Sequence, residues 1–169
     1  MKKKNTDQSL SNEVLIALRR IVQAIDLHSK SLVKNYGITG PQLVILQELW
    51  KHKELSVGEL AKAVSLGQAT VTGVLNRLEK REYITRSRSE LDKRRVHVKA
   101  TDACKELLDE APSPLQETFL NQFEGLQNWE QHLILTALQR MVAMMDARAL
   151  EAAPILATGP VDNFYQQDE

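Results

Sequence analysis

The sequence predicts a mainly helical domain with one small β-hairpin. Apolar residues recur at helical spacing through most of the 169 residues, and two Ser/Thr-x-x-Glu/Gln helix starts stand in the first half. Only one stretch, residues 84–99, alternates apolar and polar side chains as strands do. The apolar share of 43% and the charged share of 26% are typical of a globular protein, and the length favours one sizeable core.

The first expected helix covers about residues 12–36. Its apolar residues lie three, four or seven positions apart and form one stripe: Leu15, Leu18, Val22, Ile25 and Leu32. Gly37 ends it. Residues 1–11, with three consecutive lysines, are expected to be a flexible basic N-terminus.

Three shorter helices are expected next. Thr39 with Gln42, and Ser56 with Glu59, are capping boxes that start two of them. The third begins near Gly67 with an apolar face of Val71, Val74, Leu75 and Leu78. Amides, hydroxyls and one guanidinium lie mostly on its opposite side. Two short helices joined by residues 65–67 in this way predict a helix-turn-helix.

After the third helix, apolar and polar side chains alternate with a period of two residues. Residues 84–88 and 95–99 alternate in the β sense around the polar turn 89–94, which predicts a hairpin, or wing, directly after the helix-turn-helix. Helices are expected again over residues 101–110 and about 129–150. Residues 154–169 have no clear period and are expected to form a mobile tail.

Charge is distributed unevenly although the net charge is zero. From Arg77 to Lys99 there are nine basic and four acidic residues, whereas from Asp102 onward there are three basic and twelve acidic residues. A basic excess at the predicted wing is the pattern of a polyanion-binding element.

Several function classes are disfavoured. No apolar stretch reaches membrane-spanning length and the N-terminus lacks a signal core, so a cytoplasmic protein is expected. The four histidines are scattered, and no phosphate loop or nucleophile-base spacing appears, so neither catalysis, a metal nor a cofactor is expected. The single Cys104 is expected to be a small buried hydrophobe.

A set of motifs in order resembles the winged helix-turn-helix signature of the MarR family. These motifs are residues 60–61, 69–72, 78–81, 84–86, 92–94 and Thr101, and the resemblance covers about residues 12–150, within a domain expected over 12–153. It implies a winged helix-turn-helix over about 38–101, flanked by dimerisation helices over about 12–36 and 102–150. It also implies a transcription regulator, expected to be a repressor, that binds a pseudo-palindromic double-stranded DNA operator as a homodimer.

The resemblance assigns roles to individual residues. The recognition helix would present polar side chains to base edges and phosphates: Gln68, Thr70, Thr72, Asn76 and Arg77. In the wing, Asp92 would pair with an arginine to hold the wing's shape, and Arg94 would enter the minor groove. The remaining wing arginines would contact phosphates: Arg86, Arg88 and Arg95.

Three positions depart from the family pattern. Gly73 replaces a larger polar residue, which either removes a base-reading side chain or permits a closer backbone approach. Glu82 replaces the glycine that commonly ends the recognition helix, so a different end geometry is expected. Cys104 replaces another common glycine, and its acidic neighbours Asp102 and Glu106 are expected to keep the thiol protonated.

Further segments resemble MarR-type repressors of ectoine and other compatible-solute genes: residues 24–30, 39–43, 111–116 and 129–131. Small-molecule effectors are common in the family, and His28 and Trp50 are candidates to border an effector crevice. Two alternatives stay open. One is a metal- or redox-sensing regulator on the same fold; the other is a winged helix used only for protein contacts.

Overall fold

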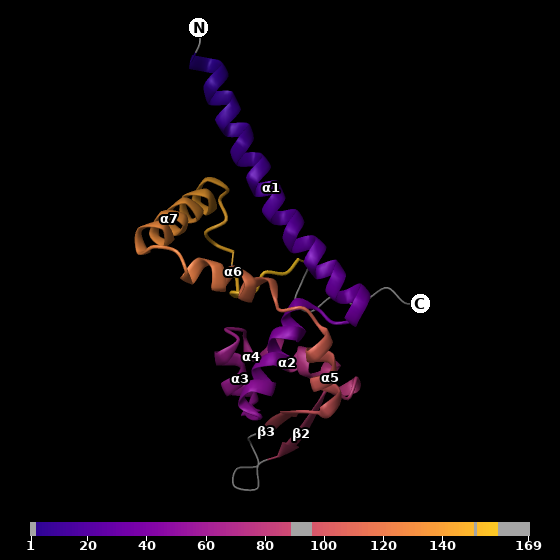
Figure 1. Cartoon of the computed structure of the whole chain (residues 1–169). Helices are drawn as coiled ribbons and strands as arrows, with labels where there is room; N and C mark the ends of the chain where they lie inside the picture. The colour runs from indigo at the N-terminus through magenta and orange to yellow at the C-terminus, as the bar shows by residue number, and fades with distance from the viewer. Residues whose placement is uncertain (1–2, 89–95, 151, 159–169) are drawn as a thin grey trace.

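The computed structural model describes residues 3–88, 96–150 and 152–158. Its elements are, in order, α1 (Lys3–Tyr36), α2 (Gly40–His52), β1 (Glu54–Ser56), α3 (Val57–Ala63), α4 (Gln68–Lys80), β2 (Ile84–Arg88), β3 (Val96–Ala100), α5 (Asp102–Glu110), α6 (Leu115–Glu124) and α7 (Asn128–Met144). Figure 1 shows α1 extending away from a winged unit built from α2 to α5 and the sheet. Helices α6 and α7 lie on the same side of that unit as α1.

Both predicted capping boxes are confirmed. At the start of α2, Gln42 Oε1 accepts a hydrogen bond from the Thr39 backbone N–H at 2.9 Å. At the start of α3, the Ser56 N–H donates to Glu59 Oε2 at 2.9 Å, and the Glu59 N–H donates to Ser56 Oγ at 3.3 Å. These bonds satisfy backbone donors that a helix start leaves unpaired, so they fix where the two helices begin.

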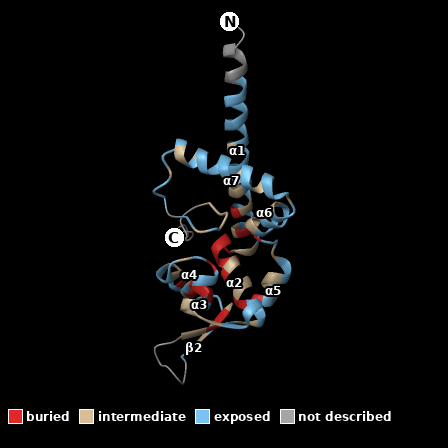
Figure 2. Ribbon diagram, turned by 90° about the vertical axis from the view of Figure 1, so that its left-hand side faces the viewer, coloured by how far each residue is buried: buried red, intermediate tan, exposed pale blue. Residues whose placement is uncertain are grey.

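The main core lies inside the winged unit, where Figure 2 shows the buried residues gathered. The predicted apolar face of α4 is buried as expected, with Val71, Val74, Leu75 and Leu78 all at most 1% exposed. They pack with residues of α2, α3 and the sheet. Because this face is fixed inward, the opposite face of α4 must point away from the core.

The sheet has three antiparallel strands in the order β1-β3-β2. The predicted hairpin is confirmed, with Ile84 opposite Ala100 and Arg88 opposite Val96. Strand β1 was not predicted, because three residues are too few to show an alternating pattern. Its pairing with β3 places Glu54 opposite Lys99 and closes the inner edge of the wing.

The flanking helices differ from the predictions in three ways. Helix α1 begins at Lys3 and not near residue 12. The expected start was placed where the apolar stripe begins, but polar residues can extend a helix beyond its stripe. Helix α6 was missed, since the prolines before it indicated only a break in the chain. Helix α7 ends at Met144, six residues before the expected end, where Asp146 takes a positive φ of 53°.

The first residues of the expected mobile tail are placed against the helices. Segment 152–158 runs back to α1, where the Thr158 backbone N–H donates to Ser29 Oγ at 3.1 Å. Ser29 is 4% exposed. Residues 159–169 lie outside the described residues.

Candidate nucleic-acid interface

The outward face of α4 carries the residues predicted to contact DNA. Gln68, Thr72 and Asn76 are exposed, and Thr70 and Arg77 are half-buried together along one edge of the buried face. At 100° per residue, the middle of the outward face falls on residues 69, 73, 76 and 80. Two of these, Ala69 and Gly73, are small, and a Cβ built on Gly73 would meet nothing within 4 Å. The centre of the helix therefore presents backbone as well as side chains to a partner.

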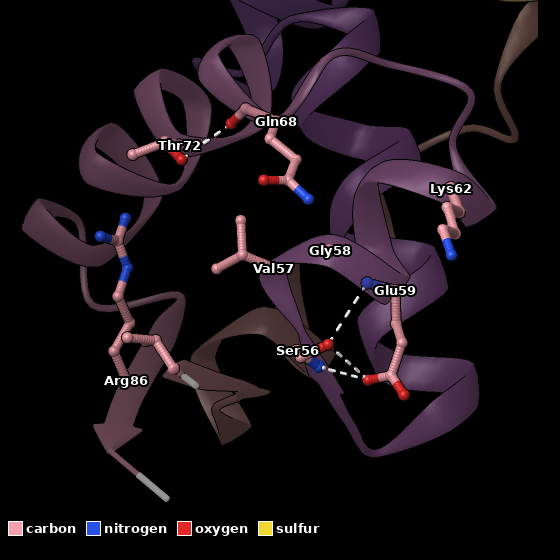
Figure 3. Close-up of a pocket in the computed structure, with 9 residues that line it drawn as sticks. Ser56, Val57, Gly58, Glu59, Lys62, Gln68, Thr72 and Arg86 are labelled. Carbon is pink, nitrogen blue, oxygen red and sulfur yellow. Dashed lines mark hydrogen bonds between the residues drawn. The ribbon is translucent and has the colours of Figure 1, made fainter. Parts of the chain in front are cut away.

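Gln68 and Thr72 are adjacent on one edge of this face. The Thr72 hydroxyl donates to the Gln68 carbonyl oxygen at 2.8 Å, one turn earlier in α4. The Gln68 amide lies over the start of α3, since a Cβ on Gly58 would stand 3.1 Å from its Nε2 (Figure 3). Gly58 thus leaves room for the amide between the two helices of the helix-turn-helix.

A hollow lies between α3, α4 and the wing. Its polar lining comes from all three elements: Ser56, Glu59, Lys62, Gln68, Thr72 and Arg86. Lys62 was not among the predicted site residues, because it belongs to the first helix of the pair and carries no motif of its own. The hollow brings Gln68, Thr72 and Arg86 together although they are up to 18 positions apart in the sequence.

Arg86 is the main cation of this hollow. Its side chain is 20% exposed, and its Nε lies 3.5 Å from Glu79 Oε2. Its Nε and Nη2 atoms are buried and form no hydrogen bond with the described residues. The Glu79 carboxylate offsets part of the guanidinium charge, and the exposed part of the side chain lines the hollow, where a phosphate oxygen would be attracted to it. This placement is compatible with the predicted phosphate contact.

Other predicted residues belong to the wing itself. Arg88 is exposed at the end of β2. Asp92, Arg94 and Arg95 lie outside the described residues, between the paired positions Arg88 and Val96. Their roles therefore stay predictions that rest on the sequence.

Some of the basic residues in this region bind other groups of the fold. Lys99 Nζ lies 2.9 Å from Glu54 Oε2, and His97 Nδ1 lies 3.5 Å from Glu54 Oε1. These pairs join β1 to β3. Arg81 donates from Nη1 to the Gly37 carbonyl oxygen at the end of α1. A count of basic residues thus overstates the charge that this surface offers to a polyanion.

The end of α4 keeps a left-handed cap, which corrects the expectation for Glu82. Glu82 has a φ of 60°, its N–H donates to the Glu79 carbonyl at 2.9 Å, and the Tyr83 N–H donates to the Leu78 carbonyl at 3.1 Å. These bonds satisfy the last carbonyls of the helix as a terminal glycine would. The Thr101 hydroxyl donates to the Glu82 carbonyl oxygen at 2.7 Å, a tertiary contact that offsets part of the cost of a left-handed non-glycine residue.

Two titratable groups outside the interface are affected by burial: Cys104, and the half-buried His28. Cys104 is fully buried, and burial raises its pKa to about 11. The predicted protonated thiol is therefore supported, although burial and not the acidic neighbours is the cause. Burial also lowers the pKa of His28, whose Nε2 has no hydrogen-bond partner in the part of the chain that the structure describes.

The structure also bears on metals and membranes. Across residues 3–88, 96–150 and 152–158, no three His, Cys, Asp or Glu side chains are grouped so that they could hold a metal ion. Within the same residues, no helix combines the length and hydropathy required to cross a membrane.

Together, the helix pair, the outward polar face of its second helix and the three-stranded wing define a winged helix-turn-helix protein. The family model described as MarR family matches residues 38–96. The organic hydroperoxide resistance transcriptional regulator of Bacillus subtilis is 32% identical over 102 residues, which cover 60% of this chain and 69% of that protein. The chain therefore belongs to the MarR family of DNA-binding transcriptional regulators.

A further relative agrees with this assignment, and solved structures agree with the fold. The uncharacterized HTH-type transcriptional regulator YsmB of B. subtilis is 28% identical over 114 residues, 68% of this chain and 78% of YsmB. Among solved structures, MepR of S. aureus in complex with DNA has a TM-score of 0.57 at 23% identity, covering 76% of this chain and 96% of MepR. YusO of B. subtilis has a TM-score of 0.52 at 25% identity, covering 86% of this chain and 99% of YusO. The fold predicted from the sequence is confirmed.

Proposed function

We propose that this regulator is a repressor that binds an inverted-repeat operator as a homodimer in the cytoplasm. One α4 would enter the major groove of each half-site, and each wing would lie against a flanking minor groove. The observation that carries the proposal is the hollow beside the exposed face of α4, which Arg86 lines together with Gln68 and Thr72. Base-reading and phosphate-binding groups are thus adjacent, as DNA docking requires.

Homodimerisation is supported by apolar surface on the flanking helices. In α6 and α7 no residue is buried, and Trp129, Leu133 and Met144 are 67%, 61% and 68% exposed. On α1, Leu15 and Val22 are 63% and 59% exposed. Exposed apolar surface of this extent marks an association site. Light scattering should return twice the chain mass of 19.1 kDa; the mass of a single chain would overturn the dimer.

The direct test of DNA binding is capture of genomic fragments by the purified full-length protein, followed by sequencing. We expect the retained fragments to share an inverted repeat whose half-site centres are about one helical turn, roughly 10 base pairs, or a multiple apart. Retention that follows fragment length without a shared sequence would contradict the proposal.

The wing has a test of its own. Arg94→Ala should weaken binding to all related sites equally and lower the slope of log affinity against log salt by about one unit per half-site. Asp92→Ala should reproduce part of that loss, because Asp92 is proposed to hold the wing's shape. Unchanged affinity and slope in Arg94→Ala would show that this arginine does not reach the DNA.

The regulated genes are proposed from the sequence resemblance of residues 24–30, 39–43, 111–116 and 129–131 to repressors of compatible-solute genes. Deletion of the regulator should then raise transcripts for ectoine or betaine synthesis or uptake at low external salt. Unchanged transcripts would remove this part of the proposal.

A small-molecule effector is also proposed. The buried His28 Nε2 is a group with which a polar ligand could form a hydrogen bond. A His28→Asn variant should lose the response of DNA binding to such a ligand.

A further inference from the structure

The last turn of α1 and the end of α4 meet at one side chain, Arg81. Arg81 is the C-terminal cap residue of α4. Its Nη1 donates to the Gly37 carbonyl oxygen, 44 positions earlier in the chain. Its Nη2 lies 3.4 Å from the Tyr83 hydroxyl oxygen, and its guanidinium carbon lies 5.0 Å from the centre of the Tyr83 ring. One guanidinium therefore bridges the junction between α1 and α2 and the end of the recognition helix.

The backbone at Gly37 is shaped to receive this contact. Gly37 has a φ of 65°, which L side chains rarely adopt, and its N–H caps α1 by donating to the Val33 carbonyl at 2.9 Å. A Cβ on Gly37 would stand 2.8 Å from Arg81 Nη2. The glycine is thus needed both for the conformation that ends α1 and for the close approach of the guanidinium.

Besides Arg81, two sets of contacts hold the end of α1: a small core around Leu32, and segment 152–158, whose Thr158 backbone N–H donates to Ser29 Oγ at 3.1 Å. Leu32 of α1 is buried with Ile38 and Leu43 in a small second core. Tyr83 packs against this core and also against the main core of the winged unit. Farther toward the N-terminus, the exposed apolar side chains of α1 show that the helix leaves the winged unit. The direction of α1 is therefore set at its last turns, where Arg81 binds.

We propose that Arg81 is a positioning residue that fixes the angle between α1 and α4 and thereby sets which half-site spacing the dimer accepts. The inference rests on the proposed function as a dimer on two half-sites. If α1 contributes to the dimer contact, its angle to α4 determines the separation and relative rotation of the two recognition helices. One base pair added between half-sites rotates one against the other by about 35°, so a fixed angle discriminates between spacings.

The test uses the full-length dimer and fluorescent duplexes that carry the inverted repeat selected by the wild-type protein. One base pair is inserted or removed between the half-sites, and affinity is measured by anisotropy. We expect Arg81→Met to reduce the preference for the selected spacing by about three- to tenfold, the range expected for losing a hydrogen bond. If Arg81→Met does not fold, Arg81→Lys takes its place. Lysine keeps the charge but not the planar fork, so this variant should also reduce the preference for the selected spacing.

Lys105→Met is the matched control. It also removes one positive charge, from an exposed position of α5 outside the face of α4 that is proposed to meet DNA. Any loss of affinity in Lys105→Met should be equal for all spacings, so its spacing preference should remain that of the wild type. An Arg81→Met variant that folds and keeps the wild-type spacing preference would overturn the proposal, as would an equal loss of preference in Lys105→Met.

A second measurement separates this inference from the proposed function. Nitroxide labels on α1 and α4 of one chain, diluted into unlabelled protein, report the distance distribution between the two helices without DNA. We expect a broader distribution in Arg81→Met than in the wild type. If wild type bound no duplex specifically, the proposed function would fail, while an unchanged distribution in Arg81→Met would overturn the positioning role itself.

Discussion

The backbone N–H of Thr158 donates a hydrogen bond to Ser29 Oγ at 3.1 Å, across 129 positions of the chain. The Thr158 hydroxyl lies 3.4 Å from Asp26 Oδ1. Beside them, a Cβ on Gly40 would stand 3.0 Å from the Ala157 Cβ. Segment 152–158 therefore joins α1 to the first residue of α2, and it explains why a glycine stands at the start of that helix.

The effect of Gly40→Ala on the free energy of unfolding should have opposite signs in chains with and without the docked tail. In a chain that ends after Ala153, Gly40→Ala should raise the free energy of unfolding by about 0.5–1 kcal/mol, because alanine has less conformational freedom to lose. In the full-length chain the same change should lower it, since the new methyl group displaces Ala157. Denaturant titrations of the four proteins check this, and a gain of equal size in both backgrounds would contradict the docked tail.

Gly73 allows stability and DNA binding to be separated. A Cβ at Gly73 meets nothing within 4 Å, so Gly73→Ala should raise the free energy of unfolding by about 1 kcal/mol through helix propensity. If the α4 backbone approaches DNA closely here, the same variant should bind the operator more weakly. Denaturant titration measures the change in stability, and fluorescence anisotropy on the same preparation measures the change in operator affinity. Greater stability with unchanged affinity would show that Gly73 merely lacks a base-reading side chain.

The sequence predicted the winged unit because its signals are local. Capping at Thr39 and Ser56, the apolar face at Val71 to Leu78, and alternation after Ile84 each lie within a short segment. The five predicted site residues of α4, half of the ten, could likewise be placed from helical geometry, since the buried face of α4 determines the outward one.

The remaining features depend on contacts between distant segments. Nothing around Arg81 indicates that it would bind Gly37, and nothing in residues 152–158 indicates a docking position against Ser29. The half-buried position of Arg86, which faces Glu79, is likewise set by packing of β2 against α4. For the apolar stripes of α1 and α7, periodicity shows that a partner is needed but does not identify it.

Cys104 is expected to be inert toward peroxide. Burial raises its pKa to about 11, so the thiol stays protonated at neutral pH, whereas the ionised form is the nucleophile. DNA release after treatment with an organic hydroperoxide should therefore be the same for wild type and Cys104→Ala. A release that occurs in wild type and vanishes in Cys104→Ala would instead favour the redox-sensing alternative.

Stability should fall as the solution becomes acidic, in part through His28. Burial lowers its pKa in the folded state, so the unfolded chain takes up the proton first. The contribution is complete above the unfolded pKa of about 6.5 and is lost as pH falls from there toward the folded pKa. Denaturant titrations across that range should show a smaller loss in His28→Asn. The control, His132→Asn, changes an exposed histidine of α7; a pH profile of His28→Asn that matched wild type would contradict the expectation.

The central claim is that the outward face of α4 reads DNA sequence. Its most direct test is an anisotropy titration of wild type and Asn76→Ala against the selected operator and a base-substituted duplex at matched salt. Asn76 is exposed at the middle of that face, so its loss should cost about 1–3 kcal/mol on the operator and little on the altered duplex. Equal affinities of wild type for the two duplexes, with Asn76→Ala unchanged on both, would contradict the account.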